Sequence, residues 1–320
     1  MAMTFSSGFL GLSFFLLLLA SSTANARMHP MFYHWSCPQL TQIVNKGVRQ
    51  ALAKEQRLGA SLLRLFFHDC FVNGCDGGLL LDDTSTFKGE KNAFPNRGTA
   101  RGFEVIDDIK TKLEVACPGI VSCADILALA TRYAVIKLGG PWWRLDLGRR
   151  DARTASESKA NRDLPSPLSS LERLVKSFKK KGMNERDLTA LSGAHTIGQA
   201  QCFLFRSRIY NDTDIDPKFA KVRQANCPWK GGNKKLAALD ERSPNKFDNQ
   251  FFKNLMKRQG LLHSDQVLFN NQSVGFIVRQ YSMFQFIFFK DFSRGMTKLS
   301  NISPLTGKKG EIRKNCRRVN

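Results

Sequence analysis

The sequence predicts a mainly α-helical protein with little β-structure. In several long stretches its hydrophobic residues recur every three or four positions, which is the spacing of a helix with one buried face. Segments with the pattern of a β-strand are few and short, and no internal repeat or low-complexity linker divides the chain. The 320 residues, 42% of them hydrophobic, suffice for one large domain or two small ones. We expect one domain.

The first 26 residues have the pattern of a secretory signal peptide. Phe9–Ala20 is apolar, and Ala24-Asn25-Ala26 ends in the small residues typical of a cleavage site. A membrane anchor is the alternative, but the apolar run is short for a bilayer span and no later stretch is long enough. We expect cleavage after Ala26, a mature chain of residues 27–320, and secretion without a membrane anchor.

Helices are expected from residue 38 onward. In the first, Pro38–Glu55, the apolar residues fall at helical spacing: Leu40, Ile43, Val44, Val48, Ala51 and Leu52. Similar patterns cover, in order, Phe103–Ala116, Ser122–Leu138, Leu168–Lys181 and Phe247–Gln259. Ser122 and Asp248 are suited to cap their helices, because their side-chain oxygens accept hydrogen bonds from free backbone N–H groups.

The run from Arg64 to Asp76 joins two patterns. Its first half is apolar and helical, and a helix places Arg64 and His68 on one face. A fixed cation beside an imidazole suits chemistry that moves a proton while negative charge develops, although a buried ion pair is the alternative. The second half is a bent loop rich in oxygen ligands, which suits calcium. Its residues of this kind are Asp69, Asn73, Gly74 and Asp76.

Eight cysteines follow the signal pattern: Cys37, Cys70, Cys75, Cys117, Cys123, Cys202, Cys227 and Cys316. An even number in a secreted chain implies disulfides, and eight thiols allow about 105 pairings, so the residues alone leave the pairing open. A zinc site is the competing interpretation. The chain has no C-x-x-C pair and no H-E-x-x-H helix, which disfavours zinc.

The formal net charge of +22 predicts attraction to polyanions. Nucleic acid is the usual partner of such a chain. A secreted protein seldom meets it, so we expect acidic wall polysaccharide and no nucleic acid; a solvated basic surface that aids solubility is the alternative. The densest basic residues are Lys179–Lys181 and, near the C-terminus, Arg313, Lys314, Arg317 and Arg318.

Two motifs carry a family resemblance. Arg64–Asp76 resembles the distal haem signature of the secreted plant peroxidases, called class III, and Asp187–Gly198 resembles their proximal haem-ligand motif. The similarity extends from Phe32-Tyr33 to the C-terminal Cys316-Arg317-Arg318-Val319-Asn320. The resemblance implies a plant haem-peroxidase fold, with one haem b held between a distal and a proximal helix in a domain of residues 27–320.

On the distal side, the resemblance implies that His68 is the acid/base that takes a proton from peroxide and returns it to the leaving oxygen. Arg64 would stabilise charge as the O–O bond breaks. Asn96 would accept from the Nδ1–H of His68 and so leave Nε2 free, and Glu90 would support that network.

On the proximal side, His195 would be the axial ligand, tuned by the carboxylate of Asp265. Gly193 and Ala194 are small, which would let a planar macrocycle approach the backbone. Further contacts to the haem would come from Phe67, Ser61, Arg57 and Gln201. Leu239 stands where relatives have an aromatic beside the axial histidine. His263 has no family role and is expected at the surface.

The resemblance also implies two calcium ions. The distal ligands would be Asp69, Val72, Gly74 and Asp76, and the proximal ligands Thr196, Asp240, Ser243, Lys246 and Asp248. The distal site normally takes a hydroxyl where this chain has Gly78. Because calcium is usually coordinated by six to eight oxygen atoms, we expect the distal site to bind calcium more weakly.

The implied disulfides are Cys37–Cys117, Cys70–Cys75, Cys123–Cys316 and Cys202–Cys227. Three sequons, at Asn211, Asn271 and Asn301, are candidate glycosylation sites.

The resemblance implies an enzyme that reduces hydrogen peroxide and oxidises small phenolic donors by one-electron steps. Pro165, through its carbonyl, and Phe94 would border the donor site. The role would lie in the cell wall, in lignin and phenolic metabolism and the response to oxidative stress, and the protein would be monomeric. The competing hypothesis is a catalytically idle, basic wall-binding glycoprotein on the same fold.

Overall fold

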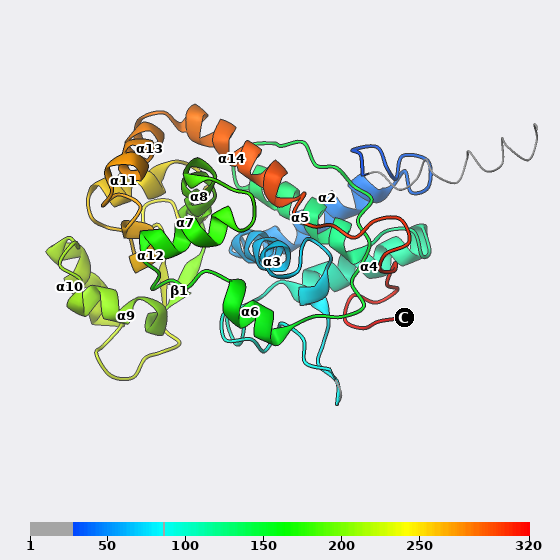
Figure 1. Cartoon of the computed structure of the whole chain (residues 1–320), viewed down its shortest axis with the longest axis horizontal. Coiled ribbons are helices and arrows are strands. Elements are labelled where there is room, and N and C mark those ends of the chain that lie inside the picture. Colours follow the sequence, from blue (N-terminus) through cyan, green and yellow to red (C-terminus); the bar gives the residue numbers. More distant parts are fainter. Residues whose placement is uncertain (1–27, 86) are drawn as a thin grey trace, which may run out of the picture.

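The computed structural model describes residues 28–85 and 87–320, so the expected signal peptide lies outside the described residues. The described chain is mainly helical, as expected (Figure 1). Its α-helices are α2 (Leu40–Lys54), α3 (Leu58–Val72), α4 (Phe103–Ala116), α5 (Cys123–Lys137), α6 (Glu157–Asp163), α7 (Leu171–Lys179), α8 (Glu185–Ser192), α9 (Cys202–Asn211), α10 (Pro217–Asn226), α11 (Gln250–Met256), α12 (His263–Gln266), α13 (Gln272–Met283) and α14 (Gln285–Leu299). Of the two 3₁₀-helices in the described chain, η2 (Gly78–Leu80) follows the first signature motif and η3 (Gly193–Thr196) lies within the second.

Helix α3 lies near the middle of the molecule, with α2, α4 and α5 on one side and α8 to α13 on the other (Figure 1). It packs against α5, which packs in turn against α2, while α8 packs against α14. The β-structure consists of β1 (Gln199–Gln201) and β2 (Leu236–Ala238), paired antiparallel with Gln199 opposite Ala238. This arrangement places the two signature motifs in facing parts of the fold.

Most helix boundaries agree with the sequence pattern. Ser122 caps α5 by accepting from the backbone N–H of Asp125 at 3.1 Å. The stretch Phe247–Gln259 was expected to be helical throughout, but only Gln250–Met256 is. Its first residue, Phe247, instead donates its backbone N–H to Leu138 at 2.7 Å, and Arg258 has a positive φ of 57°, which ends the helix.

Helix α7 is also shorter than the pattern Leu168–Lys181 predicts. It begins after Ser170, whose hydroxyl accepts from Arg173 N–H at 3.4 Å, and it ends at Lys179. The preceding Ser169 donates its N–H to Ser166 within a turn, so the first expected residues are not helical.

A large apolar core fills the space between α2, α3, α5, α8, α11 and α14, and a smaller one lies beneath α9. The disulfides are Cys37–Cys117, Cys70–Cys75, Cys123–Cys316 and Cys202–Cys227, which is the pairing the resemblance implies. Among the described residues, none of the helices is both long and apolar enough to cross a membrane.

Candidate active site

A cavity of about 330 Å³ opens between α3 and the segment formed by α8 and η3. Both signature motifs contribute to its walls, since Arg64 and His68 line it from α3 and Ala194 and His195 line it from η3. The structure therefore brings together residues that lie far apart in the sequence.

The imidazole of His68 is oriented by Asn96. His68 Nδ1 lies 2.5 Å from Asn96 Oδ1, and Asn96 Nδ2 donates to the backbone oxygen of Glu90 at 2.8 Å. Because the amide nitrogen of Asn96 is engaged in this way, its oxygen faces the imidazole and can only accept. Nδ1 of His68 therefore carries the proton, and Nε2 is the unprotonated nitrogen, which accepts from Arg64 Nε at 3.3 Å on the cavity side.

His68 is neutral at physiological pH. Its side chain lines the cavity and is partly buried. This burial and, second, the charge of Arg64 lower the pKa of His68 to about 3, although the bond to Asn96 opposes the shift. A neutral imidazole with an unprotonated Nε2 is the form that acts as a base.

Arg64 is fixed beside His68 by the loop that precedes α4. Its Nε lies 3.3 Å from His68 Nε2, while its other nitrogens donate to the carbonyls of Pro95 at 2.6 Å and Thr99 at 3.1 Å. Burial and the charge of Arg57 lower the pKa of Arg64 to about 10, so it stays charged at pH 7. The two carbonyls could not be predicted from the sequence, because they reach Arg64 only through the tertiary fold.

His195 faces the same cavity from the opposite wall. Its Nδ1 lies 2.8 Å from Oδ1 of Asp265, a buried carboxylate on α12. Burial works against protonation of His195, but the charge of Asp265 and the hydrogen bond outweigh it and raise the pKa. The carboxylate holds the Nδ1–H tautomer, so Nε2 of His195 is available as a metal ligand. The donor set and the cavity fit a haem.

Two expectations about the neighbourhood of His195 need correction. A Cβ at Gly193 would lie 2.4 Å from the ring of Phe288, so this glycine permits close packing in the core and does not make room for a macrocycle. His263 was expected at the surface, but it is half-buried, with Nδ1 2.8 Å from Oδ2 of Asp212.

Leu239 lines the cavity, as expected for a neighbour of His195. The aromatic closest to the His195 ring is instead Phe251, which meets it edge-on with centroids 6.2 Å apart.

The other expected haem contacts lie in or beside the cavity. Arg57, Ser61 and Phe67 line it, and Gln201 lies just outside, where its Nε2 donates to Gly98 O at 3.1 Å. At the mouth stand Pro165 and Phe94, and the Phe94 side chain is 69% exposed.

Comparisons with known proteins agree with this geometry. The peroxidase family model matches residues 44–283. Peroxidase P7 of Brassica rapa subsp. rapa is 57% identical over 291 residues, which cover 90% of this chain and 98% of the relative. Peroxidase 4 of Vitis vinifera is 54% identical over 95% of each chain, and a lignin-forming anionic peroxidase of Nicotiana sylvestris is 53% identical over 96% of each.

The chain belongs to the class III plant peroxidases. It is a haem peroxidase, and as in its family hydrogen peroxide and phenolic donors are the substrates.

In this peroxidase, the loop after α3 gathers carboxylates that are buried. Asp69 accepts from the backbone N–H groups of Gly77 at 3.0 Å and Leu79 at 3.3 Å, and Asp76 accepts from Gly78 at 2.9 Å. Burial, with Asp76 as the second cause, raises the pKa of Asp69 to about 8, and burial raises that of Asp76 to about 6. Arg313 is the nearby cation, but burial outweighs its effect on both groups, and such buried carboxylates are a donor set that fits a hard cation.

The remaining distal positions are close by. Val72 O accepts from Lys181 Nζ at 3.1 Å, a contact that the sequence did not reveal, and Gly74 has a φ of 131°, which favours glycine. A Cβ on Gly78 would lie 3.0 Å from Asp76 Oδ1 and 3.4 Å from Glu90 Oε1. The missing side chain therefore faces the carboxylates themselves.

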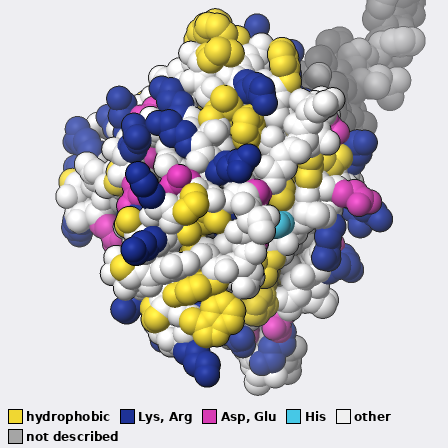
Figure 2. Space-filling model, turned by 90° about the vertical axis from the view of Figure 1, so that its left-hand side faces the viewer, with side chains coloured by type: hydrophobic (Ala, Val, Ile, Leu, Met, Phe, Trp, Pro, Cys, Tyr) yellow, Lys and Arg dark blue, Asp and Glu magenta, His cyan; other side chains and the backbone are white. Residues whose placement is uncertain are grey.

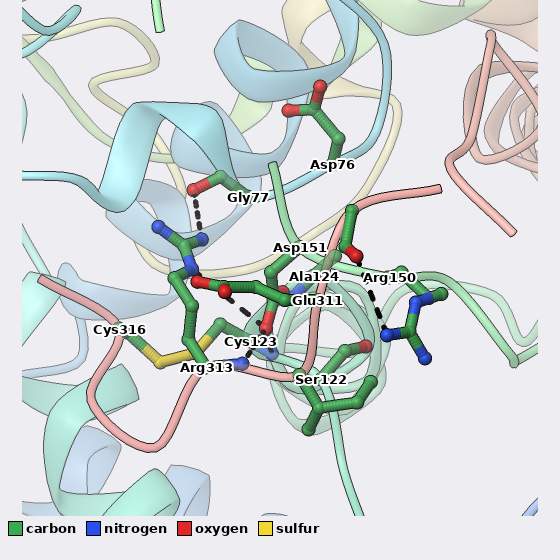
Figure 3. Close-up of polar contacts among 12 residues, drawn as sticks. Asp76, Gly77, Ser122, Cys123, Ala124, Arg150, Asp151, Glu311, Arg313 and Cys316 are labelled. Atoms are coloured by element: carbon green, nitrogen blue, oxygen red, sulfur yellow. Dashed lines mark hydrogen bonds and ion pairs between the residues drawn. A yellow bond between two sulfur atoms is a disulfide. The ribbon is translucent and has the colours of Figure 1, made fainter. Parts of the chain in front are cut away.

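The C-terminal segment contacts the loop that carries Asp76 and Gly77 (Figure 3). Arg313 Nη2 donates to the carbonyl of Gly77 at 2.5 Å, and the backbone N–H of Arg313 donates to Asp151 at 2.9 Å. The same carboxylate accepts from Cys123 N–H at 3.1 Å, and Cys123 is joined to Cys316. The disulfide and the buried Arg313 thus fix the backbone next to Asp76.

The expected proximal metal residues also lie together. Thr196 Oγ1 donates to Asp248 Oδ1 at 3.2 Å, and Ser243 Oγ donates to Asp240 at 2.9 Å and to Asp248 at 3.3 Å. Lys246 closes the same turn by donating its N–H to Ser243 O at 3.0 Å. Asp248 was expected to cap this helix, but the residue at the N-cap of α11 is Asn249; Asp248, one residue before the cap, instead accepts through Oδ1 from Gln250 N–H at 2.8 Å. Within residues 28–85 and 87–320, no three His, Cys, Asp or Glu side chains converge as a metal site. Each expected calcium site has two carboxylates among its ligands, Asp69 and Asp76 or Asp240 and Asp248.

Proposed function

We propose that this protein is a secreted peroxidase in which His195 holds the haem iron and His68 transfers protons to and from peroxide on the opposite side. The observation that carries the proposal is the 2.5 Å contact between His68 Nδ1 and Asn96 Oδ1, which leaves Nε2 unprotonated beside Arg64. When bound, the haem supplies the electrons that cleave the O–O bond. Asp265 orients His195 and makes it a better electron donor.

The protein side chains handle the protons. His68 Nε2 accepts one proton from hydrogen peroxide and returns it to the oxygen that leaves as water. Arg64, held by the carbonyls of Pro95 and Thr99, stabilises the negative charge that develops on that oxygen. In the complete reaction one hydrogen peroxide and two phenols give two waters and two phenoxyl radicals.

The phenolic donor would bind at the mouth of the cavity. Pro165 and Phe94 border it, and Phe94 exposes an aromatic face on which a phenol ring can pack. Arg57, Ser61 and Gln201 would hold the polar edge of the haem and Phe67 its apolar face. We propose a role in wall phenolic and lignin metabolism and in the response to oxidative stress.

Two calcium ions would support the fold. Asp69, Val72, Gly74 and Asp76 would bind the distal ion, and Thr196, Asp240, Ser243, Lys246 and Asp248 the proximal one. The distal site lacks a hydroxyl at Gly78, so we propose that it binds calcium more weakly.

The basic surface would retain a monomeric protein in the wall. Figure 2 shows Lys and Arg side chains spread over one face of the molecule and outnumbering Asp and Glu, in agreement with a net charge of +22. Asn211, Asn271 and Asn301 are all exposed, which suits glycosylation. A Lys-rich, secreted glycoprotein would bind acidic polysaccharide through its field.

The absorption spectrum of the purified protein tests the enzyme against the idle glycoprotein. We expect a Soret band that shifts when hydrogen peroxide is added. The proposal would be refuted if the protein folds with its disulfides but binds no haem. It would also be refuted if the Soret band does not shift when hydrogen peroxide is added.

A further inference from the structure

Helix α7 forms one wall of a surface groove that is separate from the haem cavity. The groove has a volume of about 810 Å³ and runs between α7 and the first residues of α8 and α13. Leu171 and Val175 supply its apolar lining, and Lys176, Lys179 and Lys180 supply its charge. The groove therefore combines an apolar surface with a row of cations.

The three lysines share one face of the helix. Positions 176, 179 and 180 are spaced by three and four residues, and Lys180 continues the helical path because its N–H donates to Lys176 O at 3.2 Å. All three are exposed. The basic run seen in the sequence is thus divided, because Lys181 turns away to donate to Val72 O.

These lysines have no carboxylate partner in the part of the chain that the structure describes, where none of them forms an ion pair. Two acidic residues line the groove, but Glu185 is engaged by the hydroxyl of Ser273, which donates to it at 2.9 Å. Glu172 and Glu185 together oppose the three lysines, so the lining keeps a net excess of one positive charge. An anion entering the groove would meet free ammonium groups.

We propose that this groove binds a segment of polyuronate chain, with successive carboxylates on Lys176, Lys179 and Lys180 and sugar C–H faces on Leu171 and Val175. The proposal rests on the polysaccharide binding proposed above and locates it. A single exposed ion pair contributes little, so affinity requires several on one chain. A repeating carboxylate polymer meets this requirement, whereas a lone carboxylate does not.

Asn271 stands on the opposite wall of the groove. Its Oδ1 caps α13 by accepting from Ser273 N–H at 2.9 Å, so a glycan on this sequon would project beside the lysines. Binding is therefore best measured on haem-loaded protein from which N-glycans have been removed enzymatically.

The test compares two triple variants with the same loss of charge. Lys176→Gln/Lys179→Gln/Lys180→Gln changes the groove. Lys230→Gln/Lys234→Gln/Lys235→Gln changes three exposed lysines between α10 and β2 and serves as the control. Because both variants lower the net charge by three, any difference between them reports on the groove and not on the overall field.

Affinity for polygalacturonate is measured at about 0.15 M salt, with fully methyl-esterified polymer as the uncharged counterpart. We expect the groove variant to bind about tenfold or more weakly than the parent and the control variant to change by less than about threefold. The parent should not bind the esterified polymer. Equal weakening of the two variants, with peroxidase activity intact, would show that the groove is not the polysaccharide-binding site. Absence of any binding by the parent would overturn polysaccharide binding itself.

Discussion

The imidazole of His68 and the amide of Asn96 form a hydrogen bond of 2.5 Å that fixes which ring nitrogen faces the haem cavity. Asn96 is neutral, so it orients the ring without stabilising an imidazolium as a carboxylate would. Burial and, second, the charge of Arg64 lower the pKa of His68 to about 3.

This relationship predicts the effect of Asn96→Asp on pH dependence. The base is active when neutral, that is, above its pKa, and a negative charge at Nδ1 favours the protonated form. The acid limb of the peroxide reaction should therefore move to higher pH by roughly 1–3 units. Stopped-flow rates of the reaction with hydrogen peroxide, measured between pH 3 and pH 8, locate the acid limb in the parent and the variant. An acid limb that stays in place or moves lower would contradict the assignment of Asn96.

Asp265 should set the reduction potential of the bound iron. In Asp265→Asn the carboxylate no longer supports the axial imidazole, so the ferric state loses stabilisation and the potential should rise, by about 60 mV for each tenfold change in the equilibrium. Asp212→Asn is the control, since Asp212 contacts His263 at the same 2.8 Å outside the cavity lining, although Asp212 also accepts from the buried Arg208 at 2.9 Å. Equal potentials in the two variants would argue against His195 as the ligand.

A buried ion pair should dominate stability on the α5 side. Asp125 contacts Arg149 at 2.7 Å with both side chains fully buried, and it also accepts from Tyr33 at 2.8 Å. Asp125→Ala leaves the arginine unpaired and should cost about 3–5 kcal/mol. Asp108→Ala removes an exposed i,i+4 partner of Lys112 and should cost under about 0.5 kcal/mol. Denaturant midpoints of the haem-loaded proteins compare the two.

The distal calcium should leave before the proximal one when a chelator is titrated, because Gly78 supplies no side-chain oxygen. Gly78→Ser should tighten distal binding by adding a hydroxyl, whereas Gly78→Ala adds only the Cβ, 3.0 Å from Asp76. Metal content at each chelator concentration gives the order of release. Proximal loss first, or the same effect from Ser and Ala, would show that the hydroxyl is not the deciding ligand.

Local patterns predicted much of the fold. The cap at Ser122, the helical placement of Arg64 and His68, and the mainly α class follow from spacing along the chain, which sequence records directly. What could not be predicted depends on contacts between distant segments. The carbonyls that hold Arg64 and the Lys181 contact to Val72 belong to this group, as does the packing of Phe288 against Gly193. No periodicity encodes these contacts.

The central claim is that His68 moves the protons of peroxide while His195 holds the haem. The most direct test is the second-order rate of reaction with hydrogen peroxide in haem-loaded His68→Ala, measured beside the parent protein. We expect the resting spectrum and haem content to persist and the rate to fall by roughly 10²–10⁴-fold, the usual contribution of a general acid/base. A haem-loaded His68→Ala protein that reacts with peroxide at nearly the parent rate would contradict the account.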